Sequence, residues 1–143
     1  MKLLPILALL PQLCCAAVTQ LQVRAIIQIE SGGNPKATGD KGAAAGAAQF
    51  HRASWSDTSR FRAAQGLPVY PYSSAYDLQA ATSYLHSWLT LNAKRFTAAT
   101  GRQPSTADLY AIHQLGFNGY AQRAFDIQRC PAITQRKTRA LPK

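Results

Sequence analysis

The stretch Leu21–Phe50, LQVRAIIQIESGGNPKATGDKGAAAGAAQF, combines an amphipathic helix, a sharp stop and a loop rich in glycine and alanine. Val23, Ile26 and Ile27 recur at helical spacing, so their side chains share one face of the predicted helix. Glu30, the only glutamate in the chain, falls on the same face. A charged carboxylate on an apolar face is costly unless it is solvated, paired or neutralised, so this carboxyl group either opens into a cleft or stays protonated, and both outcomes suit a general acid.

Local signals define this first helix. Thr19 is a suitable N-cap for a helix over Gln20–Ser31, and Gly32–Pro35 ends it. Glu30 then lies in the last turn, where the negative end of the helix dipole also disfavours a charged carboxylate. The alternative is that Glu30 passes the helix end and is simply solvated by water.

The segment Lys36–Gln49 consists mostly of glycine and alanine. It has too little side-chain volume for a core of its own, but its backbone can approach another group closely. We expect a loop that lines a groove, and a flexible surface linker is the alternative.

Helical periodicity continues along the rest of the chain, without any long alternating strand pattern. Residues at helical spacing predict a central buried helix over Ala75–Thr100, with contacts at Leu78, Ala81, Leu85, Trp88, Leu89, Asn92 and Phe96. Ser105 and Asp108 form a capping-box pattern for the next helix. The predicted segments are His51–Ala64, Ala75–Thr100, Ser105–Leu115 and Tyr120–Gln128, with a break at Gly116–Gly119. The predicted fold class is therefore mainly α.

The chain has 143 residues and a mass of 15.5 kDa, which suits one domain. Residues 1–17 have the pattern of a secretory signal, with cleavage after Ala17 favoured over Ala16. We expect an exported protein, periplasmic or extracellular, and rank a lipoprotein second.

The domain is placed at 18–130 and a basic tail at 131–143. If the signal is removed, Cys130 is the only remaining cysteine and no internal disulfide is possible.

The formal net charge of +10 indicates an anionic partner. For an exported protein, cell-wall glycan and its acidic polymers fit this charge better than nucleic acid does. The apolar run of the signal is too short to span a membrane, and we expect a monomer. The basic end of the chain, Gln135–Arg139, is interpreted as a solvated tail without chemistry.

Several segments, in this order and at about these separations, resemble the soluble lytic transglycosylase domain of the lysozyme-like superfamily. They are Glu30–Pro35, Gly42–Phe50, Ala107–Gly116 and Gly116–Gly119. The resemblance implies a lysozyme-like α-helical domain with a central buried helix and a glycan-binding cleft. It also implies that Glu30 is the catalytic acid and base, that Ser31 and Gln49 orient catalyst or substrate, and that Asn118 binds substrate.

The chain departs from the family's pattern in two places. Ala47 and Ala48 replace a usual Leu-Met pair, which predicts a wider groove wall. Phe117 replaces a common tyrosine, so a hydroxyl expected near the catalytic carboxyl is missing, and Tyr110 or Tyr120 is a possible replacement. The expected substrate-binding residues are Ser31, Gln49, Tyr110, His113, Phe117 and Asn118.

The implied reaction cleaves the β-1,4 bond between N-acetylmuramic acid and N-acetylglucosamine in peptidoglycan, with a 1,6-anhydromuramic product and without metal or cofactor. Hydrolysis normally needs a second carboxylate about 5–9.5 Å from the first. Asp40 is the candidate for that role, so a muramidase is the main alternative. A domain that binds peptidoglycan without cutting it, as an adaptor of a secretion, conjugation or phage-derived machine, is the other.

Overall fold

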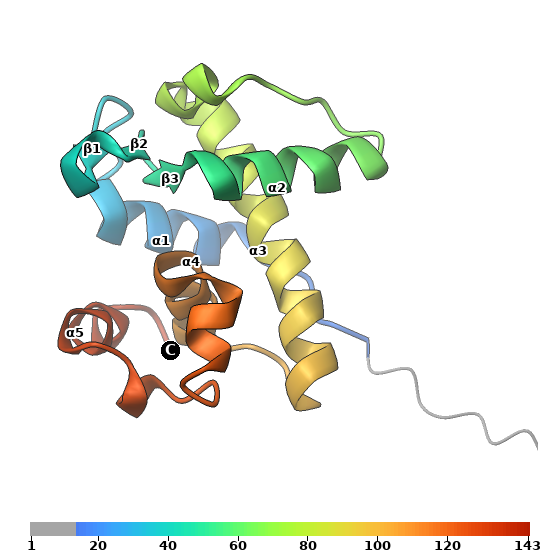
Figure 1. Cartoon of the computed structure of the whole chain (residues 1–143), viewed down its shortest axis with the longest axis vertical. Helices are drawn as coiled ribbons and strands as arrows, with labels where there is room; N and C mark the ends of the chain where they lie inside the picture. Colours follow the sequence, from blue (N-terminus) through green and yellow to red (C-terminus); the bar gives the residue numbers. More distant parts are fainter. Residues whose placement is uncertain (1–13) are drawn as a thin grey trace, which may run out of the picture.

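The computed structural model describes residues 14–143, and this part of the chain is mainly α-helical (Figure 1). The α-helices are α1 (Gln20–Ser31), α2 (Arg52–Ala64), α3 (Leu78–Thr100), α4 (Thr106–Ala121) and α5 (Ala132–Arg139). Short 3-10 helices are η1 (Asp40–Gly42), η2 (Tyr72–Tyr76) and η3 (Ile127–Arg129), and the strands are β1 (Thr38–Gly39), β2 (Ala44–Ala45) and β3 (Phe50–His51). The predicted fold class is confirmed.

Helix α3 is the central helix, as its periodicity predicted. It packs against α1, α2 and α4, and Figure 1 shows it running the height of the molecule. Leu85, Leu89 and Phe96 are fully buried in this contact. The prediction was wrong for Leu78, which is 47% exposed because it occupies the first position of the helix, before the helix enters the core.

The predicted bounds of α1 are confirmed. The Thr19 hydroxyl accepts a hydrogen bond from the Gln22 amide, and Gly32 ends the helix with a left-handed backbone at φ 65°. Val23 and Ile26 are fully buried. Glu30 therefore lies on the inward face, in the last turn of the helix.

The segment predicted as a loop is instead a small antiparallel sheet, in the order β1-β2-β3. Thr38 pairs with Ala45, and Ala45 pairs with Phe50. Gly46, at the turn between β2 and β3, has a φ of 73°, and a Cβ there would lie 1.7 Å from the Ala75 carbonyl oxygen. Each strand has only two residues, which is too short to leave a period-two signal in the sequence.

Helix α4 opens with the predicted capping box of Ser105 and Asp108. Gly116 interrupts the helix with a non-helical backbone, at a positive φ of 73° and a ψ of 160°. Helical geometry then resumes as far as Ala121. The predicted helix over Tyr120–Gln128 was wrong. Positive φ values at Ala124 and Phe125 turn the chain there, and only η3 follows.

The C-terminal segment also differs from its prediction. Residues 131–143 were expected to be a solvated tail, but α5 folds against α4 and buries Thr134, Thr138 and Leu141. Thr134 and Thr138 are one helical turn apart and so share the buried face, while the basic residues lie mostly around it. No helix among residues 14–143 has the length and apolar character needed to cross a membrane.

The predicted signal segment, 1–17, lies mostly outside the described residues. Its last part contacts the domain through Gln103, which donates to the Cys14 carbonyl at 2.8 Å and accepts from the Ala16 amide at 2.8 Å. Val18, where the domain was expected to start, is buried in the core.

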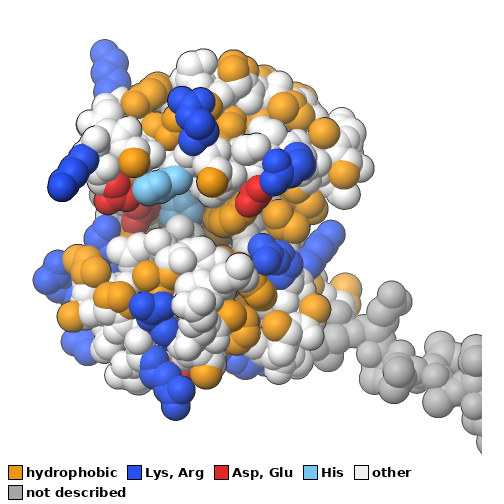
Figure 2. Space-filling model, in the orientation of Figure 1, with side chains coloured by type: hydrophobic (Ala, Val, Ile, Leu, Met, Phe, Trp, Pro, Cys, Tyr) orange, Lys and Arg blue, Asp and Glu red, His pale blue; other side chains and the backbone are white. Residues whose placement is uncertain are grey.

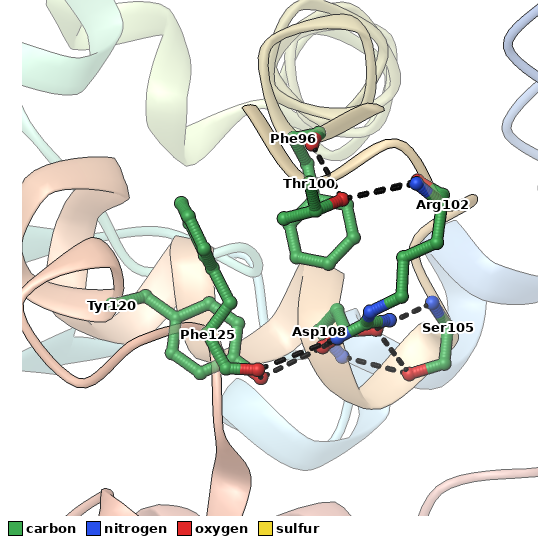
Figure 3. Close-up of polar contacts among 7 residues, drawn as sticks. All are labelled: Phe96, Thr100, Arg102, Ser105, Asp108, Tyr120 and Phe125. Carbon is green, nitrogen blue, oxygen red and sulfur yellow. Dashed lines mark hydrogen bonds and ion pairs between the residues drawn. The ribbon is translucent and has the colours of Figure 1, made fainter. Parts of the chain in front are cut away.

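A buried polar cluster around Asp108 anchors the start of α4 (Figure 3). Asp108 Oδ2 accepts from Arg102 at 2.7 Å, and Oδ1 accepts from the Tyr120 hydroxyl at 2.7 Å. The Ser105 hydroxyl and amide also donate to Oδ2. Burial alone would raise the pKa of Asp108, but the hydrogen bonds from Arg102, Tyr120 and Ser105 outweigh it and lower the pKa below its ordinary value of 3.8.

Replacement of Asp108 by asparagine should lower the free energy of unfolding by about 3 kcal/mol at neutral pH, because it removes a buried charge that three residues bind. Because the pKa of Asp108 is lowered in the folded state, this contribution is complete above about pH 5, where the carboxyl group is ionised in the folded and the unfolded chain, and it is lost as the pH falls through the pKa of the folded state. Denaturant titrations at neutral and acidic pH should therefore show the two proteins converging in stability in acid. An equal difference at both pH values would contradict this role.

Candidate functional site

The Glu30 side chain is largely shielded from solvent, with 12% of its surface exposed. The Tyr110 hydroxyl of α4 donates a hydrogen bond to Glu30 Oε1 at 2.8 Å. The ammonium group of Lys137, from α5, lies 3.5 Å from the same oxygen. Glu30 is thus neither solvated freely nor left unpaired on an apolar face, because two later helices supply its partners.

Tyr110 supplies the hydroxyl that Phe117 lacks. Burial, the charge of Glu30 and the hydrogen bond to it all raise the pKa of Tyr110 above its ordinary value of 10.0, so the phenol remains a proton donor. Of the two tyrosines left open by the sequence, Tyr120 instead donates to Asp108 in the cluster at the start of α4.

Ser31 and Gln49 bind the backbone of the small sheet. The Ser31 hydroxyl donates to the Ala47 carbonyl at 2.7 Å, which ties the end of α1 to the β2–β3 turn. The Gln49 side chain donates to the Gly46 carbonyl at 2.9 Å, within that turn. Both side chains therefore hold the backbone of the β2–β3 turn, and their direct contact with substrate stays a prediction.

Ala47 and Ala48 do not form the wall of a groove. Both are fully buried in the core, so the expected widening of a groove by their small size was wrong. Their backbone matters more than their side chains, since the Ala47 carbonyl binds Ser31 and the Ala48 carbonyl binds His113.

His113 lies one turn beyond Tyr110 on α4 and contacts the sheet. Its Nε2 lies 2.8 Å from the Ala48 carbonyl oxygen, and its ring meets that of Phe50 edge to face at 5.6 Å. Burial lowers the pKa of His113 below its ordinary value of 6.5, against the opposing effects of Glu30 and the Ala48 carbonyl. The ring is therefore neutral near pH 7, with the proton on Nε2, because a carbonyl can only accept.

A furrow of about 440 Å³ crosses the face between the start of α2, the middle of α3 and the kinked half of α4. His113, Phe117 and the exposed Asn118 line it, as the sequence predicted for a binding cleft. The Arg95 guanidinium lies over the Phe117 ring at 4.1 Å. Figure 2 shows histidine and acidic side chains gathered along this hollow.

Asp40 stands at the turn between β1 and β2, with a left-handed φ of 47°. Its Oδ2 lies 2.7 Å from His51 Nε2, and its side chain is 68% exposed. His51 lines the furrow, so Asp40 lies next to it, whereas Glu30 is not among the lining residues but is near enough to His113 for its charge to favour a higher pKa of that ring. The two carboxylates thus occupy very different environments.

Two other hollows in the described part of the chain share a single acid, Asp77, and neither is lined by a histidine. A more apolar hollow between the starts of α1 and α4 and the C-terminal residues has no acid or histidine among its lining residues in the described part of the chain. Cys130 is buried, and burial raises the pKa of its thiol, which disfavours a nucleophilic thiolate. Within residues 14–143, no group of three or more histidine, cysteine or acidic side chains is placed to bind a metal ion.

Sequence reasoning missed three residues of this region: Lys137, Trp88 as a furrow residue, and Gln114. Lys137 was assigned to a solvated tail, although Thr134 and Thr138 at helical spacing were a signal for a packed helix. Trp88 was expected in the core, where it is 5% exposed, but it also lines the furrow. No local signal distinguishes Gln114 from its neighbours.

Comparisons of this chain with protein-family models, with curated proteins and with solved structures found no match.

Replacement of Tyr110 by phenylalanine should lower the free energy of unfolding by about 1–2 kcal/mol, because the shielded Glu30 carboxylate loses a hydrogen-bond donor. Thermal unfolding followed by circular dichroism measures this change. Tyr76→Phe is the matched control, since Tyr76 is 43% exposed, and it should leave stability unchanged. Equal effects of the two substitutions would argue against the Tyr110–Glu30 bond.

Proposed function

We propose that this chain is an exported, lysozyme-like lytic transglycosylase that cleaves the β-1,4 bond between N-acetylmuramic acid and N-acetylglucosamine in peptidoglycan. The observation that carries the proposal is the environment of Glu30. A shielded carboxyl group at a helix end, oriented by Tyr110 and close to a furrow lined by α4, has the properties of a general acid and base. The net charge of +10 favours an anionic wall polymer as substrate.

In this proposal Glu30 protonates the glycosidic oxygen as the leaving sugar departs. The carboxylate then accepts the proton of the C6 hydroxyl of muramic acid, whose oxygen attacks C1 to form the 1,6-anhydro ring. Tyr110 and Lys137 both approach Oε1. Within residues 14–143 no hydrogen bond involves Oε2, which makes it the oxygen for proton transfer to and from substrate.

The two partners of Glu30 support different parts of this cycle. The Tyr110 hydrogen bond orients the carboxyl group in both protonation states, because a carboxylic acid still accepts through one oxygen. The Lys137 ammonium stabilises the carboxylate that forms after proton donation. Lys137 is thus proposed as a positioning residue that acts through Glu30.

Hydrolysis by a muramidase is the second candidate, and the contact between Asp40 and His51 is the observation in its favour. This contact places a carboxylate at the mouth of the furrow. Its high exposure and its bond to His51 make Asp40 less suited than a shielded carboxylate to act on the opposite face of the sugar. The products distinguish the two reactions.

Wild-type protein should release soluble fragments from purified peptidoglycan that end in anhydromuramic acid, one water lighter than hydrolytic products by mass spectrometry. Glu30→Gln should reduce release at least about a thousandfold, because the amide cannot transfer the proton. Asp126→Asn, which changes a half-exposed acid that does not line the furrow, is the control and should retain activity. Reducing ends would indicate hydrolysis, and unchanged release by Glu30→Gln would exclude Glu30 as the catalyst.

Lys137→Met should lower the rate at which soluble fragments are released about tenfold, because the carboxylate formed after proton donation loses the cation that lies 3.5 Å from it. Lys137→Arg should restore the wild-type rate because it keeps the charge. Arg136→Met, an exposed neighbour on the same helix, is the matched control and should retain the wild-type rate. An unchanged rate for Lys137→Met, or no rescue by Lys137→Arg, would contradict this role of the charge.

A further inference from the structure

Three polar side-chain atoms of the furrow are buried without a hydrogen-bond partner among residues 14–143. They are Trp88 Nε1 on α3 and His113 Nδ1 and Gln114 Oε1 on α4. Trp88 is only 5% exposed. A buried polar atom without a partner typically costs about 1–3 kcal/mol, so three such atoms at one hollow are unusual for a purely structural region.

The other tryptophan of the chain shows the ordinary arrangement. Trp55 is equally deep in the core, and its Nε1 donates to the Tyr70 carbonyl at 3.0 Å. Within residues 14–143, the indole of Trp55, away from the furrow, therefore has a hydrogen-bond partner, whereas the indole of Trp88, which lines the furrow, has none.

The hydrogen-bonding capacities of the three atoms define the chemistry that they match. An indole Nε1 can only donate. His113 Nδ1 accepts, because the proton of the neutral ring is on Nε2, facing the Ala48 carbonyl. Gln114 Oε1 also accepts. A carboxylate offers only acceptors and an ammonium only donors, whereas a secondary amide offers a carbonyl oxygen and an N–H together.

We propose that the furrow contains a subsite for a secondary amide group, whose carbonyl accepts from Trp88 and whose N–H donates to His113 or Gln114. Two sources carry this group in peptidoglycan: the acetamido substituent of an amino sugar and the peptide bonds of the stem. The subsite rests on the proposed function only for the identity of this natural ligand. The residues concerned come from α3 and α4 and are separate from the catalytic Glu30.

Isothermal titration of the Glu30→Gln protein with three probes tests the subsite without interference from cleavage. The probes are an N-acetylglucosamine tetramer, cellotetraose and a short stem peptide without sugar. Cellotetraose has the same β-1,4 linkage and no charge, but a hydroxyl in place of each acetamido group. We expect the N-acetylated tetramer or the peptide to bind at least about tenfold more tightly than cellotetraose, and the one that binds identifies the source of the amide.

Substitutions in the Glu30→Gln background locate the binding. Trp88→Phe removes the donor and Gln114→Leu removes an acceptor, and each should weaken binding of the preferred probe about tenfold. Trp55→Phe makes the same chemical change as Trp88→Phe at the satisfied tryptophan and should leave affinity unchanged. If Trp88→Phe does not fold, Gln114→Leu carries the test. Equal affinity for all three probes, binding of none, or no effect of these substitutions would overturn the subsite.

Digestion of peptidoglycan by the wild-type protein separates this inference from the proposed function. Amide-selective binding that depends on Trp88 and Gln114, without any cleavage, would refute the transglycosylase and keep the subsite. Cleavage with no preference for the amide would do the reverse.

Discussion

The hydrogen bond from Tyr110 to Glu30 joins the end of α1 to the middle of α4, and the arrangement of the whole site depends on it. The same two helices are also joined through the small sheet, because Ser31 binds the Ala47 carbonyl and His113 binds the Ala48 carbonyl. The backbone of the β2–β3 turn is therefore fixed from both sides. The contacts from Tyr110 and Lys137 fix the orientation of the Glu30 carboxyl group before the reaction begins. Little entropy is therefore lost in positioning this group during the reaction.

This bond requires that α4 present the correct face to α1. The Asp108 cluster fixes the start of the helix, where Arg102, Ser105 and Tyr120 all bind the buried carboxylate. Tyr110 and His113, which follow within two turns, then point towards α1 and the sheet. Residues on both sides of the kink at Gly116, from His113 to Gly119, line the furrow, so one helix supplies both the support of Glu30 and the lining of the furrow.

The surroundings of Glu30 and the furrow differ in whether their shielded polar groups have hydrogen-bond or ion-pair partners. Around Glu30, Tyr110 and Lys137 both contact Oε1, and the cation comes from α5, the last helix of the described chain. In the furrow, buried donors and acceptors are left without partners. The first arrangement is suited to holding one carboxyl group in position through changes of protonation. The second is suited to binding an uncharged polar group of a ligand. The free energy lost by leaving these donors and acceptors unpaired is regained only when a ligand completes their hydrogen bonds.

The sequence by itself determined the features that depend on neighbours three or four residues apart: the bounds and caps of α1, the capping box of α4, the central α3, and the placement of Glu30 in a last turn on a buried face. Only the tertiary structure decided the partners of Glu30. Tyr110 is 80 residues away, and Tyr120 was an equal candidate until the packing of α4 directed it to Asp108. The sheet and α5 were missed for the same physical reason, since two-residue strands and a short basic helix are stabilised by contacts with distant segments rather than by their own sequence.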